Sequence, residues 1–411
     1  MKLIAIVWAA GQATGLQSDQ LSALQPLAGR PALQFTLEAV RALEPSDLIV
    51  VADDERTRQA AGDEGTHIIR AEQSDMASAW QQVESSAAGR AETILVVPGN
   101  APLLRSATLC QMIEVHTAEK ATVTQLGTQG GILCIHAGWL WPNLGLLYAL
   151  NAGPFQPARL ASEQGRLVSC SHPADPLETI TLDDRANLAQ AEAEIRRRIN
   201  LQWMLSGVSL IHPEATYIEA DVEIGAGTVI WPNTLLQGQT RIGQDCTIGP
   251  SSVIRDSTID DECRVELSVV EQAIMEKGSD VGPFGHLRKG AHLGPGAHMG
   301  NFGEVKNSYL GPGAKMGHFS YMGDATVGAE ANIGAGTITC NYDGQRKHRT
   351  TVGKEAFIGS GTMLVAPIEI GDEAKTGAGS VVTHDVPAGG VAYGVPARLK
   401  DTPGTEESEA E

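Results

Sequence analysis

The feature that most constrains this chain is a six-residue repeat of aliphatic side chains in its second half. The first run of the repeat has no miss over Ile218, Ile224, Ile230, Leu236, Ile242, Ile248 and Ile254. A helix is excluded, because a spacing of six does not fit a period of 3.6 residues. A fixed short period is typical of a solenoid in which each unit supplies one short strand and one turn, and three units close a triangular coil. We therefore expect a left-handed parallel β-helix of hexapeptide repeats over residues 207–400.

Three further runs continue the period, at Val281, Leu287, Leu293, Met299 and Val305, at Leu310, Met316 and Met322, and at Val352, Ile358, Leu364 and Ile370. The 46 glycines concentrate in this half, which indicates regular turns rather than ordinary loops. The period breaks over Thr337–Thr351. Because an insertion must leave the core of a solenoid, we expect an external loop there.

In the first part of the chain, short apolar strands alternate with helical patterns. The expected strands are Leu3–Trp8, Leu48–Val51, His67–Ile69, Thr93–Val97 and Gly131–Ile135, and two expected helices are Pro31–Leu43 and Ala77–Ala88. Alternation of this kind predicts an α/β domain over residues 1–182, with a Rossmann-like parallel sheet covered by helices. The apolar start also resembles a short signal peptide, but a buried first strand is favoured because no longer apolar segment follows it.

Two more segments complete the organisation. Residues 183–206 predict a linker helix, with Asp183 or Asp184 as its N-cap. The tail, residues 401–411, is acidic and built of small residues, so we expect it to be disordered.

Composition limits the partners. The formal charge of −19 argues against nucleic acid and against an anionic membrane surface, although a local basic cluster still allows an anionic small substrate. No stretch approaches the roughly 18 apolar residues of a spanning helix. The six cysteines are scattered without a CxxC, which predicts reduced, mostly buried thiols in a cytoplasmic protein.

Long motifs in the second half carry a resemblance to a known family. They are Gly282-Pro283-Phe284 with Leu287-Arg288, Gly300-Asn301-Phe302 with Glu304 and Lys306, Gly317-His318, Tyr321-Met322-Gly323-Asp324, Asn332 to Gly344, Gly359-Ser360 and Val365-Ala366-Pro367. Residues 205–385 strongly resemble the acetyltransferase domain of the bacterial bifunctional N-acetylglucosamine-1-phosphate uridyltransferase / glucosamine-1-phosphate acetyltransferase family. Residues 1–204 resemble its nucleotidyltransferase domain weakly.

The resemblance implies the residues of an acetyl-transfer site. His318 matches the family's catalytic base, a role that suits imidazole because it titrates near neutral pH. Glu304 would orient that base or bind the sugar. Basic residues that match the family's substrate-binding positions are Arg288, Lys306 and Lys347, for which solvated surface charge is the alternative. Tyr321 and Asn332 would hydrogen-bond the sugar or its phosphate.

The same resemblance implies contacts to acetyl-CoA from Asn341, Tyr342, Ser360 and Ala378, the last two of which are equally typical of tight turns. The family often has an arginine where Gly394 stands, so Arg398 or Lys400 would have to supply its charge. The family is trimeric, with sites between subunits, so we expect a homotrimer whose site residues need not come from one chain.

The N-terminal motifs depart from the family. Gly15 and Ser22 stand where the phosphate-binding arginine and lysine belong, and the base-binding stretch is altered over 73–79. Asn100 replaces an aspartate that binds Mg²⁺, while Asp183 aligns with the second ligand. Because triphosphate chemistry needs these charges, we expect this domain to fold without transferring nucleotidyl groups, and Mg²⁺ to matter only if it is active.

The leading hypothesis is therefore acetyl-CoA-dependent N-acetylation of glucosamine-1-phosphate, a step toward UDP-N-acetylglucosamine. Two alternatives stay open. One is a bifunctional enzyme that retains UTP-dependent uridyltransferase activity, and the other is a non-catalytic scaffold that binds nucleotide sugars. The sequence does not distinguish glucosamine from galactosamine as the acceptor.

Overall fold

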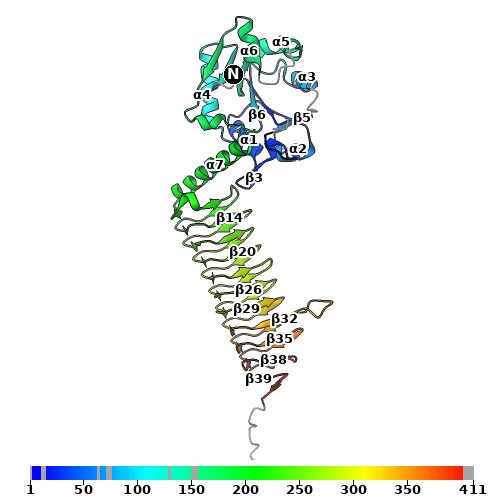
Figure 1. Ribbon diagram of the computed structural model, residues 1–411, viewed down its shortest axis with the longest axis vertical. Helices are drawn as coiled ribbons and strands as arrows, with labels where there is room; N and C mark the ends of the chain where they lie inside the picture. The colour runs from blue at the N-terminus through cyan, green and yellow to red at the C-terminus, as the bar shows by residue number, and fades with distance from the viewer. Residues whose placement is uncertain are drawn as a thin grey trace, which may run out of the picture. The chain divides into compact units, whose positions relative to one another are not determined.

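The chain forms two compact units in the computed structural model, Met1–Ile195 and Arg196–Glu411 (Figure 1). The structure describes residues 2–10, 15–62, 65–70, 76–127, 131–149 and 156–400. The division falls inside helix α7 (Arg185–Leu205), which covers the segment predicted as a linker helix. The acidic tail, predicted to be disordered, lies outside the described residues.

The first unit is a seven-stranded sheet in the order β5-β4-β1-β6-β8-β7-β9. Its strands are β1 (Leu3–Trp8), β4 (Asp47–Ala52), β5 (Thr66–Arg70), β6 (Thr93–Pro98), β7 (Val123–Leu126), β8 (Leu133–His136) and β9 (Val168–Ser171). Its main helices are α1 (Ala32–Arg41), α2 (Glu55–Ala61), α3 (Met76–Ala87), α4 (Ser106–Ala118), α5 (Ala137–Ala149) and α6 (Pro157–Glu163). Among the described residues, no helix has the length and apolar character needed to cross a membrane.

The sheet is mainly parallel, as predicted, with one strand as the exception. β8 pairs antiparallel with both β6 and β7. The connection from β7 to β8 spans only residues 127–132, which is too short for the crossover that a parallel pair requires. The chain therefore turns back as a hairpin at this point.

Both faces of the sheet are buried, which explains why β1 is apolar at every position. Ile4 and Ile6 pack into one core with Trp80 of α3. Ala5 and Val7 lie between them in sequence and pack into a second core on the other face. Successive side chains of a strand point to opposite faces, so a continuous apolar run fits a sheet covered by helices on both sides.

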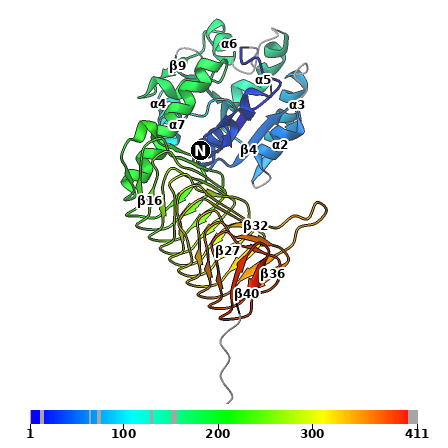
Figure 2. The same ribbon diagram turned by 60° about the horizontal axis from the view of Figure 1, so that its bottom comes forward.

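The second unit is a three-sided parallel β-helix (Figure 2). Each coil adds one strand to each of three sheets: sheet I has 12 strands and begins with β10 (Ser209–Leu210), sheet II has 10 and begins with β11 (Tyr217–Ile218), and sheet III has 9 and begins with β12 (Glu223–Ile224). The strand number rises by three between most neighbours in a sheet, as expected for coils of three strands. The predicted hexapeptide β-helix is confirmed.

One inward side chain per strand builds a single continuous core. Ile218 pairs in register with Leu236, and Leu236 with Ile254 on the next coil. All the predicted repeat positions are buried in this core. It also continues where the sequence pattern was lost, through Ile259, Val265, Val270 and Met275, because some steps there contain five residues instead of six.

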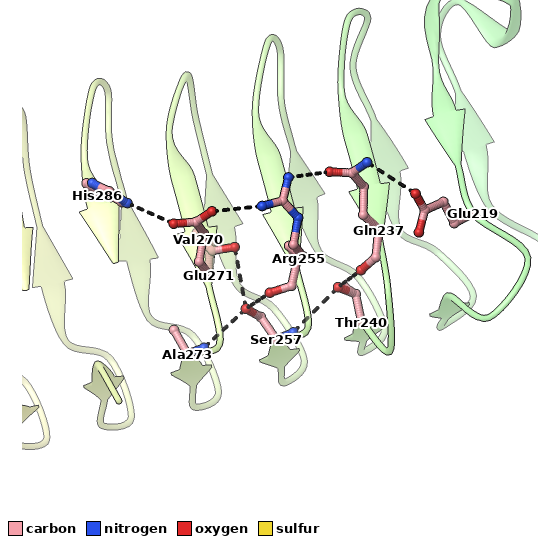
Figure 3. Close-up of polar contacts among 9 residues, drawn as sticks. All are labelled: Glu219, Gln237, Thr240, Arg255, Ser257, Val270, Glu271, Ala273 and His286. Atoms are coloured by element: carbon pink, nitrogen blue, oxygen red, sulfur yellow. Dashed lines mark hydrogen bonds and ion pairs between the residues drawn. The ribbon is translucent and has the colours of Figure 1, made fainter. Parts of the chain in front are cut away.

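Polar side chains follow the same coil-to-coil register (Figure 3). At a buried corner, Ser257 Oγ accepts a hydrogen bond from the Ala273 N–H at 3.2 Å and donates to the Arg255 carbonyl oxygen at 2.8 Å. On the outer face of sheet II, Arg255 bonds Gln237 at 2.9 Å and Glu271 at 3.1 Å. Small buried hydroxyls thus form hydrogen bonds with backbone groups at the turns, where strand pairing does not supply a partner.

The cysteines are free, as predicted. Cys134, Cys246 and Cys263 are buried, but Cys110 and Cys170 are exposed, so the prediction of mostly buried thiols holds for only part of the set. Burial raises the pKa of Cys134 to about 12 and that of Cys246 to about 11. These two thiols are therefore neutral and unreactive at physiological pH.

Truncating one core position tests the stacking directly. Leu287 is fully buried in mid-solenoid, so Leu287→Ala should lower the free energy of unfolding by about 2–5 kcal/mol, measured by guanidinium unfolding. The matched control is Ile274→Ala, because Ile274 lies on an outward position and is 44% exposed. It should cost less than about 1 kcal/mol. Equal losses for the two variants would contradict the inward assignment.

Candidate active site

An ion pair marks the outer face of sheet II at its middle coils. Arg288 follows β23 (His286–Leu287), and its Nη1 donates to Glu304 Oε1 at 2.6 Å. Glu304 lies in β26 (Gly303–Lys306). Both side chains are about half exposed, and the hydrogen bond and charge of Glu304 raise the pKa of Arg288. The pair holds one edge of the guanidinium and leaves its other N–H groups for a ligand.

Tyr321 and Lys306 continue this face onto the next coil. Tyr321 lies in β29 (Ser320–Gly323) and is the register partner of Glu304, while Lys306 is the partner of Gly323. The Tyr321 hydroxyl lies against Gly323, where a Cβ would collide with it, and that Cβ would also lie 2.8 Å from Asn341 Nδ2. Glycine at this position therefore leaves room for the tyrosine. Four predicted substrate contacts thus share one face.

His318 lies at the corner between sheets I and II, just after β28 (Lys315–Met316). Its side chain is exposed, and within the described residues no hydrogen bond or ion pair engages its ring. The next corners along the solenoid stack in order: the Gly361 N–H donates to the Ala335 carbonyl oxygen, and the Gly379 N–H donates to that of Ser360, each at 2.7 Å. Ser360 and Ala378 therefore lie in the same column as His318.

This corner column changes character at His318. Phe284 and Phe302, on the preceding coils, are stacked with ring centroids 5.2 Å apart and are 53% and 61% exposed. On the following coils the corner carries only glycine, alanine and serine over 334–336, 359–361 and 377–379. At Gly379 even an added Cβ would meet nothing within 4 Å. The exposed aromatic column continues to Phe319, which is next to His318 and lies against Gly336, and the corners beyond it carry only small side chains.

Asn341, Tyr342 and Lys347 belong to an external loop, residues 341–349, between β32 (Ile338–Cys340) and β33 (Thr350–Val352). The loop stands out from the stack of coils in both views (Figure 1, Figure 2). Tyr342 and Lys347 form a bridge across it. The break in the period had predicted such a loop.

Asp343 gives this loop its shape. Its carboxylate accepts hydrogen bonds from the N–H groups of Gln345 at 2.7 Å and Arg346 at 2.6 Å, and it pairs with His348 Nε2 at 2.7 Å. These donors hold the pKa of the Asp343 carboxyl well below its usual range, with the backbone N–H of Arg346 as the largest cause. The loop that carries Lys347 is therefore ordered by its own contacts at neutral pH.

Two predicted residues lie elsewhere. Asn332, in β31 (Asn332–Ile333), is on sheet I beside Lys315. Arg398 lies in β40 (Ala397–Leu399), opposite Tyr393 of β39 (Val391–Gly394), whereas Gly394 pairs with Ala397. Side chains alternate between the faces of a hairpin, so Arg398 projects from the face opposite to that of residue 394. It does not occupy the position of the family arginine it was expected to replace.

The predicted acetyl-CoA contacts therefore fall on two edges of sheet II. Ser360 and Ala378 lie at the I–II corner, in the column of the predicted base His318, and Asn341 and Tyr342 lie at the II–III corner. At about 3.3 Å per residue, the strand between these corners separates them by up to roughly 20 Å. One chain alone does not bring all of these residues together.

Comparisons with known proteins agree with this architecture. Family models match at residues 5–173 (MobA-like NTP transferase domain), 221–256 (bacterial transferase hexapeptide, six repeats) and 349–384 (hexapeptide repeat of succinyl-transferase). The bifunctional protein GlmU of Pelobacter propionicus is 38% identical over 436 residues, covering 94% of this chain and 95% of that protein. The chain belongs to the GlmU family.

A second relative matches most of the chain, and a solved structure matches about half of it. The bifunctional protein GlmU of Shouchella clausii is 33% identical over 428 residues, covering 93% of this chain and 94% of that protein. A solved nucleotidyl transferase from Methanothermobacter thermautotroptrophicus has a TM-score of 0.41 and 21% identity, covering 48% of this chain and 98% of that one.

The two residues that the sequence predicted to match the family's Mg²⁺ ligands, Asn100 and Asp183, lie in the first unit, and Asn100 contacts the residue before Asp183. β1 pairs with β4 on one side and β6 on the other, so its carboxyl end is where ligands bind in open α/β sheets. Asn100 follows β6, and its carbonyl oxygen accepts the Leu182 N–H at 3.1 Å, next to Asp183. The N-cap of α7 is Asp184, whose Oδ1 accepts the Asn187 N–H at 2.7 Å. The alternative role of Asp183 as that cap is therefore wrong.

The described residues at this position offer oxygen donors but no cluster of metal ligands. Asn100 and Asp183 supply one amide and one carboxylate, oxygen donors of the kind Mg²⁺ takes, and Thr181 already donates to Asp183 at 2.5 Å. Across the described part of the chain, no group of three or more His, Cys, Asp or Glu residues could hold a metal ion. Ser22 is only 6% exposed, so it faces the interior. The rest of the altered motifs, at 11–14 and 71–75, lies outside the described residues.

Asp324 has no predicted role, although it lies within the motif Tyr321-Met322-Gly323-Asp324. Asn307, Asp324 and Asn341 are spaced 17 residues apart, which is the local length of one coil. That spacing was the available signal that their side chains stack at one corner.

Removing the charge of Asp343 tests what orders the external loop. A carboxyl whose pKa is depressed in the folded state contributes order above its unfolded pKa, and that order is lost as pH falls through the folded pKa. Asp343→Asn should therefore loosen the loop even at neutral pH and speed tryptic cleavage after Arg346, Lys347 or Arg349 several-fold, read by mass spectrometry. Asp372→Asn, which alters a similar acceptor for the Lys354 N–H, is the matched control. Cleavage at the same rate in both variants would refute the role of Asp343.

Proposed function

We propose that this chain transfers the acetyl group of acetyl-CoA to the amine of glucosamine-1-phosphate, a step toward UDP-N-acetylglucosamine. The observation that carries the proposal is the position of His318. It is an exposed imidazole at the I–II corner, where stacked aromatic side chains are followed by small residues. It lies just before β29, the strand next to the one that carries Glu304 of the Arg288–Glu304 pair. Membership of the GlmU family supports the same class of reaction.

The sugar phosphate would bind through cations on sheet II and the external loop. Arg288 keeps N–H groups that Glu304 does not occupy, and Lys306 lies on the same outer face. Lys347 would reach the phosphate from the loop that Asp343 orders. A planar guanidinium suits a forked grip on phosphate oxygens, while each ammonium adds a point charge. Tyr321 and Asn332 would then hold the sugar hydroxyls.

The transfer needs one proton acceptor at the nucleophile. The amine nitrogen of the sugar would attack the thioester carbon, and His318 would take the proton that this nitrogen loses. The resulting tetrahedral oxyanion collapses by breaking the C–S bond, and the CoA thiolate leaves and is protonated. Backbone N–H groups near the proposed thioester position would stabilise the oxyanion. Glu304 would hold the charged groups of this face in place.

Acetyl-CoA would lie along the column of small residues that runs from His318 past Ser360 and Ala378. Asn341 and Tyr342 would contact it from a second chain, because one chain separates these groups by the width of sheet II. A homotrimer with coils side by side would bring the two edges together. Arg398 lies beside a cavity of about 530 Å³ at the end of the solenoid and would meet the phosphate end of CoA from there.

For the first unit we propose loss of nucleotidyl transfer. The arginine and lysine that neutralise a triphosphate are replaced by Gly15 and a buried Ser22, and only one carboxylate, Asp183, remains of the metal pair. If Mg²⁺ binds, Asn100 and Asp183 would hold it and it would supply charge neutralisation for phosphate oxygens. The named relatives are bifunctional, so retained uridyltransferase activity is the alternative.

The acetyl-transfer proposal is tested with His318→Ala. Because removal of a general base typically costs about 10²–10⁴-fold in rate, we expect that loss in thiol release from acetyl-CoA and glucosamine-1-phosphate. Asn301→Ala, at the preceding corner of the same column, is the control and should retain most of the activity. A wild-type chain without thiol release would favour the scaffold reading, and an unchanged rate in His318→Ala would remove the assigned base.

The state of the first unit is tested separately. With UTP, N-acetylglucosamine-1-phosphate and Mg²⁺, the chain should release pyrophosphate no faster than a no-enzyme blank, because two phosphate-binding cations are absent. Robust release that Asp183→Ala abolishes would establish the bifunctional alternative instead. Galactosamine-1-phosphate, assayed in parallel for acetylation, would decide which amino sugar is preferred.

A further inference from the structure

Three side chains stack at the corner between sheets II and III, at the root of the external loop. Asn307, Asp324 and Asn341 occupy successive coils, and the Asp324 N–H donates to the carbonyl oxygen of Lys306 at 3.1 Å. Asn307 and Asp324 both have positive φ angles, of 47° and 52°. Asn and Asp tolerate this left-handed region better than other residues with side chains, which explains their use at the turn.

The central carboxylate joins the other two. Asp324 Oδ1 accepts a hydrogen bond from Asn307 Nδ2 and Oδ2 accepts one from Asn341 Nδ2, each at 2.6 Å. A carboxylate is the one side-chain group here that accepts at both ends without offering a donor. An amide at 324 would turn its own N–H₂ toward one of the two N–H₂ groups. The chemistry of residue 324 therefore sets which way the Asn341 amide points.

That orientation has a consequence for the proposed site. Asn341 is only 8% exposed, and with Nδ2 held by Asp324 its Oδ1 is directed away from the carboxylate. The same Nδ2 lies 2.8 Å from where a Cβ on Gly323 would stand, next to the Tyr321 ring. The hydrogen bond from Asn341 to Asp324 therefore holds this loop residue close to the outer face of sheet II.

The backbone ties both ends of the loop to the same corner. The Asp324 carbonyl oxygen accepts the Thr350 N–H at 3.2 Å, just after the loop. The Asn341 carbonyl oxygen accepts the His348 N–H at 2.8 Å and closes the loop on itself. Asp324 thus fixes the beginning of segment 341–349 through its side chain and the end through its main chain.

We propose that Asp324 is a positioning residue for acetyl-CoA: its carboxylate holds the Asn341 amide in the orientation that contacts the cosubstrate and anchors the loop beside it. The proposal rests on the function proposed above. It assigns Asp324 no contact with either substrate. Its effect should therefore fall mainly on acetyl-CoA. Binding of the sugar phosphate should change less, because Arg288 and Lys306 lie outside the loop and only Lys347 belongs to it.

The test is Asp324→Asn, which keeps the size of the side chain and its tolerance of positive φ. We expect the KM for acetyl-CoA in the thiol-release assay to rise about tenfold, equivalent to about 1.4 kcal/mol. The KM for glucosamine-1-phosphate should rise by less than about threefold, because only Lys347 of its three cations lies in the loop. The matched control is Asp256→Asn, at the same kind of corner on an earlier coil, with φ of 48° and a carboxylate that accepts the Gln239 N–H at 3.0 Å. It should change neither KM.

Hydrogen exchange of segment 341–349 gives a readout that does not need catalysis. Exchange should be faster in Asp324→Asn than in wild type and unchanged in Asp256→Asn. Equal KM values and equal exchange in all three proteins would overturn the proposal. A rise of the same size in both KM values would overturn it too, because a general structural role would produce it. If wild type releases no thiol at all, the proposed function fails. Calorimetric titration with acetyl-CoA then tests the role of Asp324 without catalysis. Weaker binding in Asp324→Asn but not in Asp256→Asn supports the proposal, and equal affinity in all three proteins refutes it.

Discussion

The second unit depends on one repeated contact, the stacking of an inward aliphatic side chain on the equivalent side chain of the next coil. Leu236 on Ile254 is one instance, and the core of buried residues runs unbroken from Val208 to Ala392. Burial of these side chains supplies the stabilisation, and parallel backbone pairing between coils sets their register. A side chain on an outward position or at a corner then necessarily lies above its counterpart one coil earlier.

The register between coils brings the residues of the candidate site together. Arg288 meets Glu304 because the two lie one coil apart on the same sheet, and Asp324 meets Asn307 and Asn341 for the same reason. The corner column that contains His318 is open on its later coils because glycine, alanine and serine occupy equivalent positions there. In such a fold the residues of a site line up in columns that cross the coils. From β11 onward, register partners on adjacent coils are 16 to 18 residues apart in the chain, or 25 apart across the external loop.

Much of this could be predicted from the sequence, because hydrophobic periodicity reports burial directly. The six-residue repeat predicted the β-helix and its core, and the break in it predicted the loop that carries Lys347. The core through Ile259 and Met275 was not predicted, because steps of five residues remove the period while the coil still closes. The pairing of Arg288 with Glu304 was not predicted either, since it depends on the local coil length.

Other misses have local causes. β8 is antiparallel because the connection before it is short, and the strand pattern alone does not include the length of that connection. Asp184 rather than Asp183 caps α7, a choice that depends on the backbone path after Leu182. Arg398 could be placed near the end of the chain, but the face from which it projects required the pairing of the final hairpin.

The central claim is that the site joins His318 of one chain to the Asn341 edge of another. Mixing tests it most directly: His318→Ala and Asn341→Ala chains, each inactive alone, are unfolded together, refolded and assayed for thiol release. Mixed assemblies contain some seams that carry an intact His318 beside an intact Asn341. The account predicts that activity returns in the mixture and not in either variant treated alone. A mixture that assembles and stays inactive would contradict it.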